Sequence, residues 1–155
     1  VYYASGDAGL NTSAEGSFHA QVFDTIGAKN AATGIEVVSS GTGTVVSMEQ
    51  LIQWQPDYIL AATDAVYQLI QSDESWQELE AVKAGHVYLT PSAPYNFLGY
   101  PPSVNRLLGI QWLGQLMYPD HYQLDTEKAV TEYYELFYHM KPTSSQLSEI
   151  LKDAV

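Results

Sequence analysis

The sequence predicts an α/β fold with a mostly parallel sheet of about four to five strands, helices on both faces and a helical C-terminal third. Up to residue 90, short runs of β-branched and aromatic residues alternate with segments of helical apolar spacing. This alternation favours parallel strands joined by right-handed helical crossovers. After residue 103 the apolar residues recur only with helical spacing, which predicts helices and loops to the end.

Three short segments are expected as buried strands because they are rich in apolar, β-branched or aromatic residues: residues 1–4, 57–62 and 86–90. Residues 5–16, rich in Gly, Ser, Thr, Asn and Asp, are expected to form a turn or binding loop. The last strand is followed by a loop that contains several aromatic residues. Open α/β sheets bind ligands at the carboxyl ends of their strands, so this loop is expected at a binding edge.

The helices of the first part carry their own start and stop signals. Ser17 is expected to cap a helix that Gly27 ends. Its apolar face is expected to comprise Phe18, Val22, Phe23 and Ile26. Residues 47–50, Ser-Met-Glu-Gln, form a capping-box pattern for a second helix, which Pro56 stops. Further helices are expected over residues 65–71 and 76–84.

Three more helices are expected in the C-terminal third: residues 103–117, residues 126–140, and a last one capped by Thr143. Prolines 119 and 142 mark the breaks between them. The expected packing faces are Val104, Leu107, Leu108 and Trp112 in the first and Val130, Tyr134, Phe137 and Tyr138 in the second.

Composition excludes several classes of function. The chain has 155 residues, a net charge of −12 and a single arginine, Arg106, so a nucleic-acid partner is excluded because phosphate contacts need clustered cations. The chain contains no cysteine, and its four histidines lack metal-ligand spacing, so no metal site is expected. No apolar run reaches the roughly 18 residues of a membrane helix.

The best candidate ligand contacts lie in the loop after residue 90: Tyr95, Asn96, Phe97 and Tyr100. Aromatic side chains offer large rigid faces to a macrocycle or a catecholate, and a tyrosine phenolate can also bind ferric iron. Packing of the following helix is the alternative role for these residues. Asn105 and Arg106, on the first turn of that helix, are interpreted as structural residues.

Four segments in this order resemble the iron-compound substrate-binding proteins of ABC importers, the family of siderophore, haem and cobalamin binders. They are residues 101–109 (Pro-Pro-Ser-Val-Asn-Arg-Leu-Leu-Gly), 46–51, 26–31 and 79–88. The resemblance implies two α/β lobes joined by one long helix. It therefore implies that residues 1–155 are a single C-terminal lobe, and that the N-terminal lobe and the linking helix lie outside this chain.

The resemblance implies an extracytoplasmic, monomeric binding protein, in the periplasm or lipid-anchored, that has no resident cofactor and is not an enzyme. It would deliver an iron complex, a ferric siderophore or haem, to the membrane permease of an ABC importer. Molybdate, tungstate or cobalamin is the alternative cargo. A small flavodoxin-like enzyme ranks lower because the sequence lacks paired carboxylates, a nucleophile motif and a phosphate cradle.

Two further residues are assigned from the loop and helix near residue 17. The resemblance to cobalamin binders implies permease docking through Glu15, with Asp7 as the substitute in the same loop. His19 is a further candidate ligand contact, since it lies at the start of the helix. Gly99 and Tyr100 stand where many relatives have Asp-Arg, so the arginine that could neutralise an anionic ligand is missing there, which counts against a bare oxyanion or a carboxylate-rich siderophore.

Overall fold

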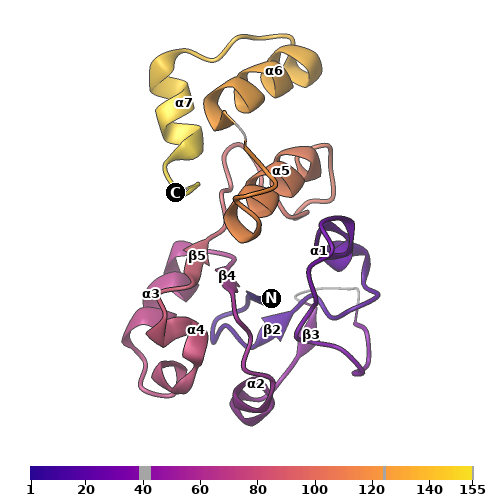
Figure 1. Cartoon of the computed structure of the whole chain (residues 1–155), viewed down its shortest axis with the longest axis vertical. Helices are drawn as coiled ribbons and strands as arrows, with labels where there is room; N and C mark the ends of the chain where they lie inside the picture. Colours follow the sequence, from indigo (N-terminus) through magenta and orange to yellow (C-terminus); the bar gives the residue numbers. More distant parts are fainter. Residues whose placement is uncertain (39–42, 124, 155) are drawn as a thin grey trace. The chain divides into compact units, whose positions relative to one another are not determined.

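The computed structural model describes residues 1–38, 43–123 and 125–154, and the chain forms two compact units, Val1–Thr90 and Pro91–Val155 (Figure 1). The first unit contains the strands and the second unit, as far as it is described, contains helices and loops. The α/β class and the helical C-terminal third are therefore confirmed. The expectation that the whole chain is one lobe stays a prediction.

The core of the first unit is a parallel sheet of three strands in the order β1-β4-β5, formed by β1 (Tyr2–Ala4), β4 (Ile59–Ala61) and β5 (Val87–Leu89). All three predicted strands are present, one or two residues shorter at their ends. The sheet has fewer strands than the four to five expected. The remaining two strands, β2 (Asn11–Thr12) and β3 (Thr44–Val45), form a separate antiparallel pair.

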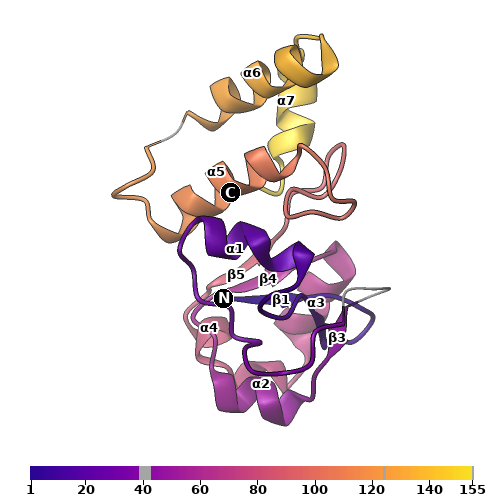
Figure 2. The ribbon, with the colours of Figure 1, turned by 90° about the vertical axis from the view of Figure 1, so that its right-hand side faces the viewer.

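The sheet is buried on both faces. Consecutive residues of a strand point to opposite faces, and all three residues of β1 and of β4 are buried. One face packs into a cluster with Leu51, Ile70 and Trp76. Figure 2 shows α1 (Gln21–Thr25) above β1 and α2 (Met48–Trp54) below it, so helices flank the sheet on both sides, as predicted.

The remaining helices of the first unit connect the strands. They are η1 (Phe18–Ala20), α3 (Asp64–Ser72), η2 (Trp76–Glu78) and α4 (Glu80–Lys83). The helix predicted over 76–84 is interrupted because Leu79 is fully buried with an extended backbone. The capping box at Ser47 is confirmed: its hydroxyl accepts from Gln50 N (3.1 Å) and its N–H donates to Gln50 Oε1 (2.9 Å).

The first helix differs from its prediction at Phe18, which is 52% exposed although Val22, Phe23 and Ile26 are buried. Ser17 caps the segment as expected, but its hydroxyl accepts from Ala20 N at the start of a 3₁₀ turn, η1. A 3₁₀ turn has three residues per turn rather than 3.6, so the helical spacing that placed Phe18 on the buried face does not apply there.

The second unit contains α5 (Arg106–Met117), α6 (Thr126–Tyr138) and α7 (Ser144–Leu151). The first of these begins three residues later than predicted, because residues 103–105 form a turn. The capping box of α7, between Thr143 and Gln146, is present. No helix in the described ranges is long and apolar enough to cross a membrane.

The predicted packing faces of α5 and α6 are only partly buried. In α5, Leu108 and Trp112 are buried, whereas Val104 and Leu107 are exposed. In α6, Val130 and Tyr134 are buried, whereas Phe137 and Tyr138 are exposed; Tyr133, which was not predicted, is buried as well. The spacing of apolar residues identifies a helix and its apolar face. It does not say how much of that face is covered by other residues of the same chain.

The loop before α5 reaches that helix at Gly109, which is buried. A Cβ atom at residue 109 would overlap the carbonyl oxygen of Phe97, a backbone atom. Only glycine therefore allows this approach between the helix and the loop.

We expect Gly109→Ala to destabilise the protein, although alanine is favoured over glycine inside a helix by about 1 kcal/mol. The methyl group must displace the Phe97 carbonyl, and overpacking of this kind costs about 1–3 kcal/mol. Urea unfolding measures the change. The control is Ser148→Ala on the exposed surface of α7, which should change the free energy of unfolding by less than about 0.5 kcal/mol. An increased stability of Gly109→Ala would contradict the close approach.

Candidate functional site

The predicted ligand loop, residues 91–105, lies in the second unit and is held by its own hydrogen bonds. The Phe97 N–H donates to the carbonyl of Pro91 (2.9 Å). The Leu98 N–H donates to Asn96 Oδ1 (2.9 Å). The loop therefore has a defined backbone shape before any ligand binds.

The four predicted contacts of this loop differ in accessibility. Phe97 is 1% exposed and Asn96 is 8% exposed, so their side chains shape the loop from inside. Tyr95 is 49% exposed and Tyr100 is half-buried, so these two side chains present surface to a solute. The ligand role of all four stays a prediction, and the two tyrosines are the members that are accessible on this loop.

The loop also receives the guanidinium of Arg106, which sequence reasoning treated as structural. A Cβ at Gly99 would lie 2.7 Å from Arg106 Nε and 2.9 Å from its Nη2, so the guanidinium packs directly against the Gly99 backbone. Burial lowers the pKa of Arg106, and its electrostatic interaction with Tyr100 opposes that shift. The only arginine of the chain thus lies beside the residues that stand where relatives carry Asp-Arg.

Glycine at position 99 is required for this arrangement. Its φ of 126° is one that residues with a side chain rarely adopt, and a side chain there would occupy the space of the guanidinium. In the sequence, the glycine next to Tyr100 signals only that the backbone can adopt an unusual conformation there. It does not say which side chain packs against that position.

Asn105 has a structural role, as predicted. It is 0% exposed, and its Oδ1 accepts hydrogen bonds from the hydroxyls of Tyr133 and Tyr138, the second at 3.4 Å. Burial raises the pKa of Tyr133, and its hydrogen bond with Tyr138 raises it further. Burial also raises the pKa of Tyr134, to about 12. Tyr133 therefore donates to Asn105 as a neutral hydroxyl over the ordinary range of pH.

The remaining predicted residues lie in the first unit. Glu15 is exposed, its N–H donates to the carbonyl of Ala32 (2.8 Å), and its carboxylate accepts a hydrogen bond from the Thr33 hydroxyl. His19 is half-buried, with its ring 6.0 Å from that of Phe18 in an edge-on arrangement. Asp7 is exposed. The docking and ligand roles of these residues stay predictions.

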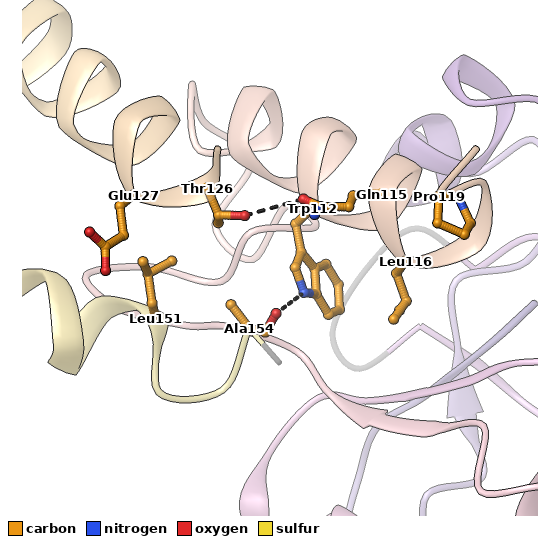
Figure 3. A pocket seen from close by; sticks show the side chains of 8 residues that line it. All are labelled: Trp112, Gln115, Leu116, Pro119, Thr126, Glu127, Leu151 and Ala154. Carbon is orange, nitrogen blue, oxygen red and sulfur yellow. Dashed lines mark hydrogen bonds between the residues drawn. The ribbon is translucent and has the colours of Figure 1, made fainter. Parts of the chain in front are cut away.

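The second unit has a hollow of about 580 Å³ that the sequence did not predict (Figure 3). Trp112 and Leu116 of α5 line it together with Leu151 and Ala154 near the C-terminal helix. Two hydrogen bonds join polar groups of its lining: Trp112 Nε1 donates to the Ala154 carbonyl, and the Thr126 hydroxyl donates to Gln115 Oε1, both at 3.2 Å. None of the predicted ligand residues lines this hollow.

Metal binding has no support in the residues that the structure describes, since they contain no group of three His, Asp or Glu side chains placed to hold an ion. The candidate site is therefore a rigid loop with two accessible tyrosines and one guanidinium. Such a site can bind a solute through donors and aromatic faces. It contains no paired acid and base of the kind that general acid–base catalysis uses.

Comparison with known proteins finds relatives that bind solutes. Over 143 residues the chain is 32% identical to the molybdate-binding protein MolA of Haemophilus influenzae, covering 89% of this chain and 38% of MolA. The solved structure of MolA bound to molybdate matches with 28% identity and a TM-score of 0.71, covering 91% of this chain and 42% of that chain.

Two further solved structures show the range of the likeness. An ABC transporter solute binding protein from Sulfurospirillum deleyianum matches with 32% identity and a TM-score of 0.86, over 97% of this chain and 46% of that one. A possible iron-binding protein from Staphylococcus epidermidis matches with 16% identity and a TM-score of 0.57, over 76% of this chain and 44% of that one, which shows the fold alone.

The chain thus spans less than half the length of these relatives. The family model described as periplasmic binding protein matches residues 1–94, which is more than half of the chain. The matched segment contains the whole parallel sheet and Glu15, and it ends just before Tyr95. The chain belongs to the periplasmic binding protein family.

Proposed function

We propose that this chain is one lobe of an extracytoplasmic binding protein that captures a small solute for an ABC importer. We further propose that the solute is a tetrahedral oxyanion of the molybdate and tungstate type. The observation that carries the proposal of an anion is the guanidinium of Arg106 packed against Gly99 and beside Tyr100. The molybdate-binding relative supports the same cargo.

An oxyanion needs positive charge and several hydrogen-bond donors. A guanidinium supplies both, because it is planar, always charged and presents its N–H groups as a fork that fits two oxygen atoms at once. The Tyr100 hydroxyl adds a neutral donor. In a chain with a net charge of −12, the location of its single arginine at this loop favours capture of an anion there.

An iron complex, a ferric siderophore or haem, is the second candidate cargo. The observation that favours it is the 49% exposed side chain of Tyr95, since an accessible aromatic ring can stack on a flat ligand. The relative described as possibly iron-binding is only 16% identical and supports the fold, not the cargo. Cobalamin would use the same aromatic surface and has no separate support.

One lobe is expected to bind weakly by itself. Small-molecule sites typically bury about 70–90% of the ligand surface, and a single loop covers one side of the solute. The relatives are more than twice as long as their match to this chain. We therefore assign the opposite wall of the site to the part of the protein outside residues 1–155, and the affinity tests below use the full-length gene product.

Substitutions at Arg106 and Tyr95 distinguish an oxyanion from an iron complex as the bound solute. If the solute is an oxyanion, Arg106→Gln should weaken molybdate binding about ten- to hundredfold, since a hydrogen bond to a charged group contributes about 1.5–3 kcal/mol. Arg106→Lys should restore part of the affinity because it keeps the charge. Tyr95→Ala is the matched control on the same loop and should have little effect. Isothermal titration with molybdate, with sulfate for comparison, measures these affinities.

Binding of haem or a ferric siderophore that depends on Tyr95 and not on Arg106, without any binding of molybdate, would overturn the oxyanion proposal in favour of the iron complex. The circular dichroism spectrum of each variant shows whether the lobe is folded. This check is needed because the Arg106 side chain also packs against Gly99.

Delivery to the permease is proposed to involve Glu15. Its carboxylate is exposed, and it is held by the Thr33 hydroxyl on a loop that is fixed by the Glu15–Ala32 backbone bond. Asn30 fixes the same loop further, because its Nδ2 donates to the Ser13 carbonyl (2.8 Å). A carboxylate in a fixed position can pair with a cationic group of the permease at a low entropic cost.

Glu15→Arg should leave solute affinity unchanged and slow transport in a reconstituted system with saturating molybdate. The substitution places a like charge opposite the cationic site, which is more disruptive than the loss of one exposed ion pair, worth under about 1 kcal/mol. Asp7→Arg, the same change of charge in the same loop, is the control. A normal rate for Glu15→Arg with a slow rate for Asp7→Arg would move the docking contact to Asp7.

A further inference from the structure

The second unit carries an exposed apolar surface that its own helices do not cover. It is formed by side chains around the start of α5 and the end of α6, with Val104 just before α5 and Met140 just after α6, and is here called the α5/α6 patch: Val104, Leu107, Leu136, Phe137, Tyr138 and Met140. Each of these residues is at least 38% exposed, and Leu136 is 70% exposed. Exposed apolar residues that lie together mark an interaction surface more often than isolated ones do, and Leu107, Leu136 and Phe137 line one hollow.

The patch continues a stripe on α6. Tyr133, Leu136 and Phe137 follow the spacing i, i+3, i+4, which places them along one side of the helix. Tyr133 at the start of this stripe is buried, whereas Leu136 and Phe137 are exposed. Met140 follows the end of the helix and is exposed as well. The apolar side of α6 is therefore buried near Tyr133 and exposed toward the C-terminal end of the helix. This pattern is typical of a helix whose exposed end packs against another protein surface.

Three residues of the patch, Leu107, Leu136 and Phe137, line a hollow of about 450 Å³. Polar side chains, among them those of Lys128 and Glu132, line other parts of it. An apolar centre with polar residues around it is the usual composition of a protein interface. The hollow is thus suited to receive an apolar side chain from another protein surface.

Internal contacts hold the aromatic members in place. The Tyr138 hydroxyl donates to Asn105 Oδ1 (3.4 Å), and the Phe137 ring lies 5.0 Å from that of Tyr133. The rings of Tyr134 and Tyr138 are 5.1 Å apart. A surface whose aromatic rings are fixed before contact loses little conformational entropy when a partner covers it.

We propose that the α5/α6 patch is the surface on which the part of the protein outside residues 1–155 packs. This inference rests on the proposal that the chain is one lobe of a longer protein. The Sulfurospirillum deleyianum structure matches 97% of this chain but only 46% of its own length, so a relative with these same helices has more than half of its chain available to cover them. The expected occupant is an apolar helix or sheet face of that other part.

Single cysteines test this proposal well because the chain has none of its own. We would measure the rate at which a thiol reagent labels Leu136→Cys in the 155-residue chain and in the full-length gene product. Val45→Cys is the matched control, since Val45 in β3 is 72% exposed and Leu136 is 70% exposed. Met140→Cys provides a second position on the patch in case one variant fails to fold. The unsubstituted proteins give the background labelling.

Labelling at Leu136→Cys and Met140→Cys should be at least about tenfold slower in the full-length protein than in the 155-residue chain, with Val45→Cys equally fast in both. Equal rates at the patch in the two forms would overturn the proposal. A rate in the 155-residue chain that falls as its concentration rises would overturn it too, by assigning the patch to a second copy. If labelling at the patch were slowed only after lipid vesicles were added, the result would overturn the proposal by assigning the patch to a membrane surface. The assay contains no solute, so failure of the oxyanion proposal would leave its result unaffected.

Discussion

The hydrogen bonds of the buried Asn105 amide are the interaction on which both the candidate ligand loop and the α5/α6 patch depend. It accepts hydrogen bonds from Tyr133 and Tyr138 and so fixes the end of α6 against the start of α5. The next two residues along the chain are Arg106, which packs under the candidate ligand loop, and Leu107, which belongs to the α5/α6 patch. A buried amide that lost these partners would leave polar groups unsatisfied, at a cost of about 1–3 kcal/mol for each. One contact between helices therefore positions the proposed anion contact and the proposed packing surface together.

The candidate solute loop and the α5/α6 patch therefore share one structural support, the first turn of α5. The start of α5 presents three successive residues to different surroundings: Asn105 to the interior, Arg106 to Gly99 and Leu107 to the hollow beside α6. A surface that covers the patch would contact the same turn that carries the guanidinium. Under both proposals, a change in the packing of this turn would therefore be expected to affect anion binding by the loop as well.

The sequence was sufficient where local patterns decide structure. The three buried strands and the capping boxes at Ser47 and Thr143 follow from residue type and spacing, and they are present. The short pair β2 and β3 was missed because two-residue strands with polar members have no periodicity to detect. Phe18 was misplaced because a 3₁₀ turn precedes α1. The role of Arg106 could not be read from its neighbours in sequence, since its position depends on a glycine seven residues earlier whose missing side chain leaves room for it.

The order β1-β4-β5 has a consequence for how the chain folds. Tyr2 pairs with Ile59, so β1 has no parallel partner until β4 has formed, whereas α6 contacts its two neighbours in sequence, α5 and α7. Contacts distant in sequence form slowly because a long loop must close first, and local helical contacts form quickly. Until β4 has formed, β1 with its two tyrosines is therefore an unpaired apolar strand, the kind of segment that is prone to associate with other chains.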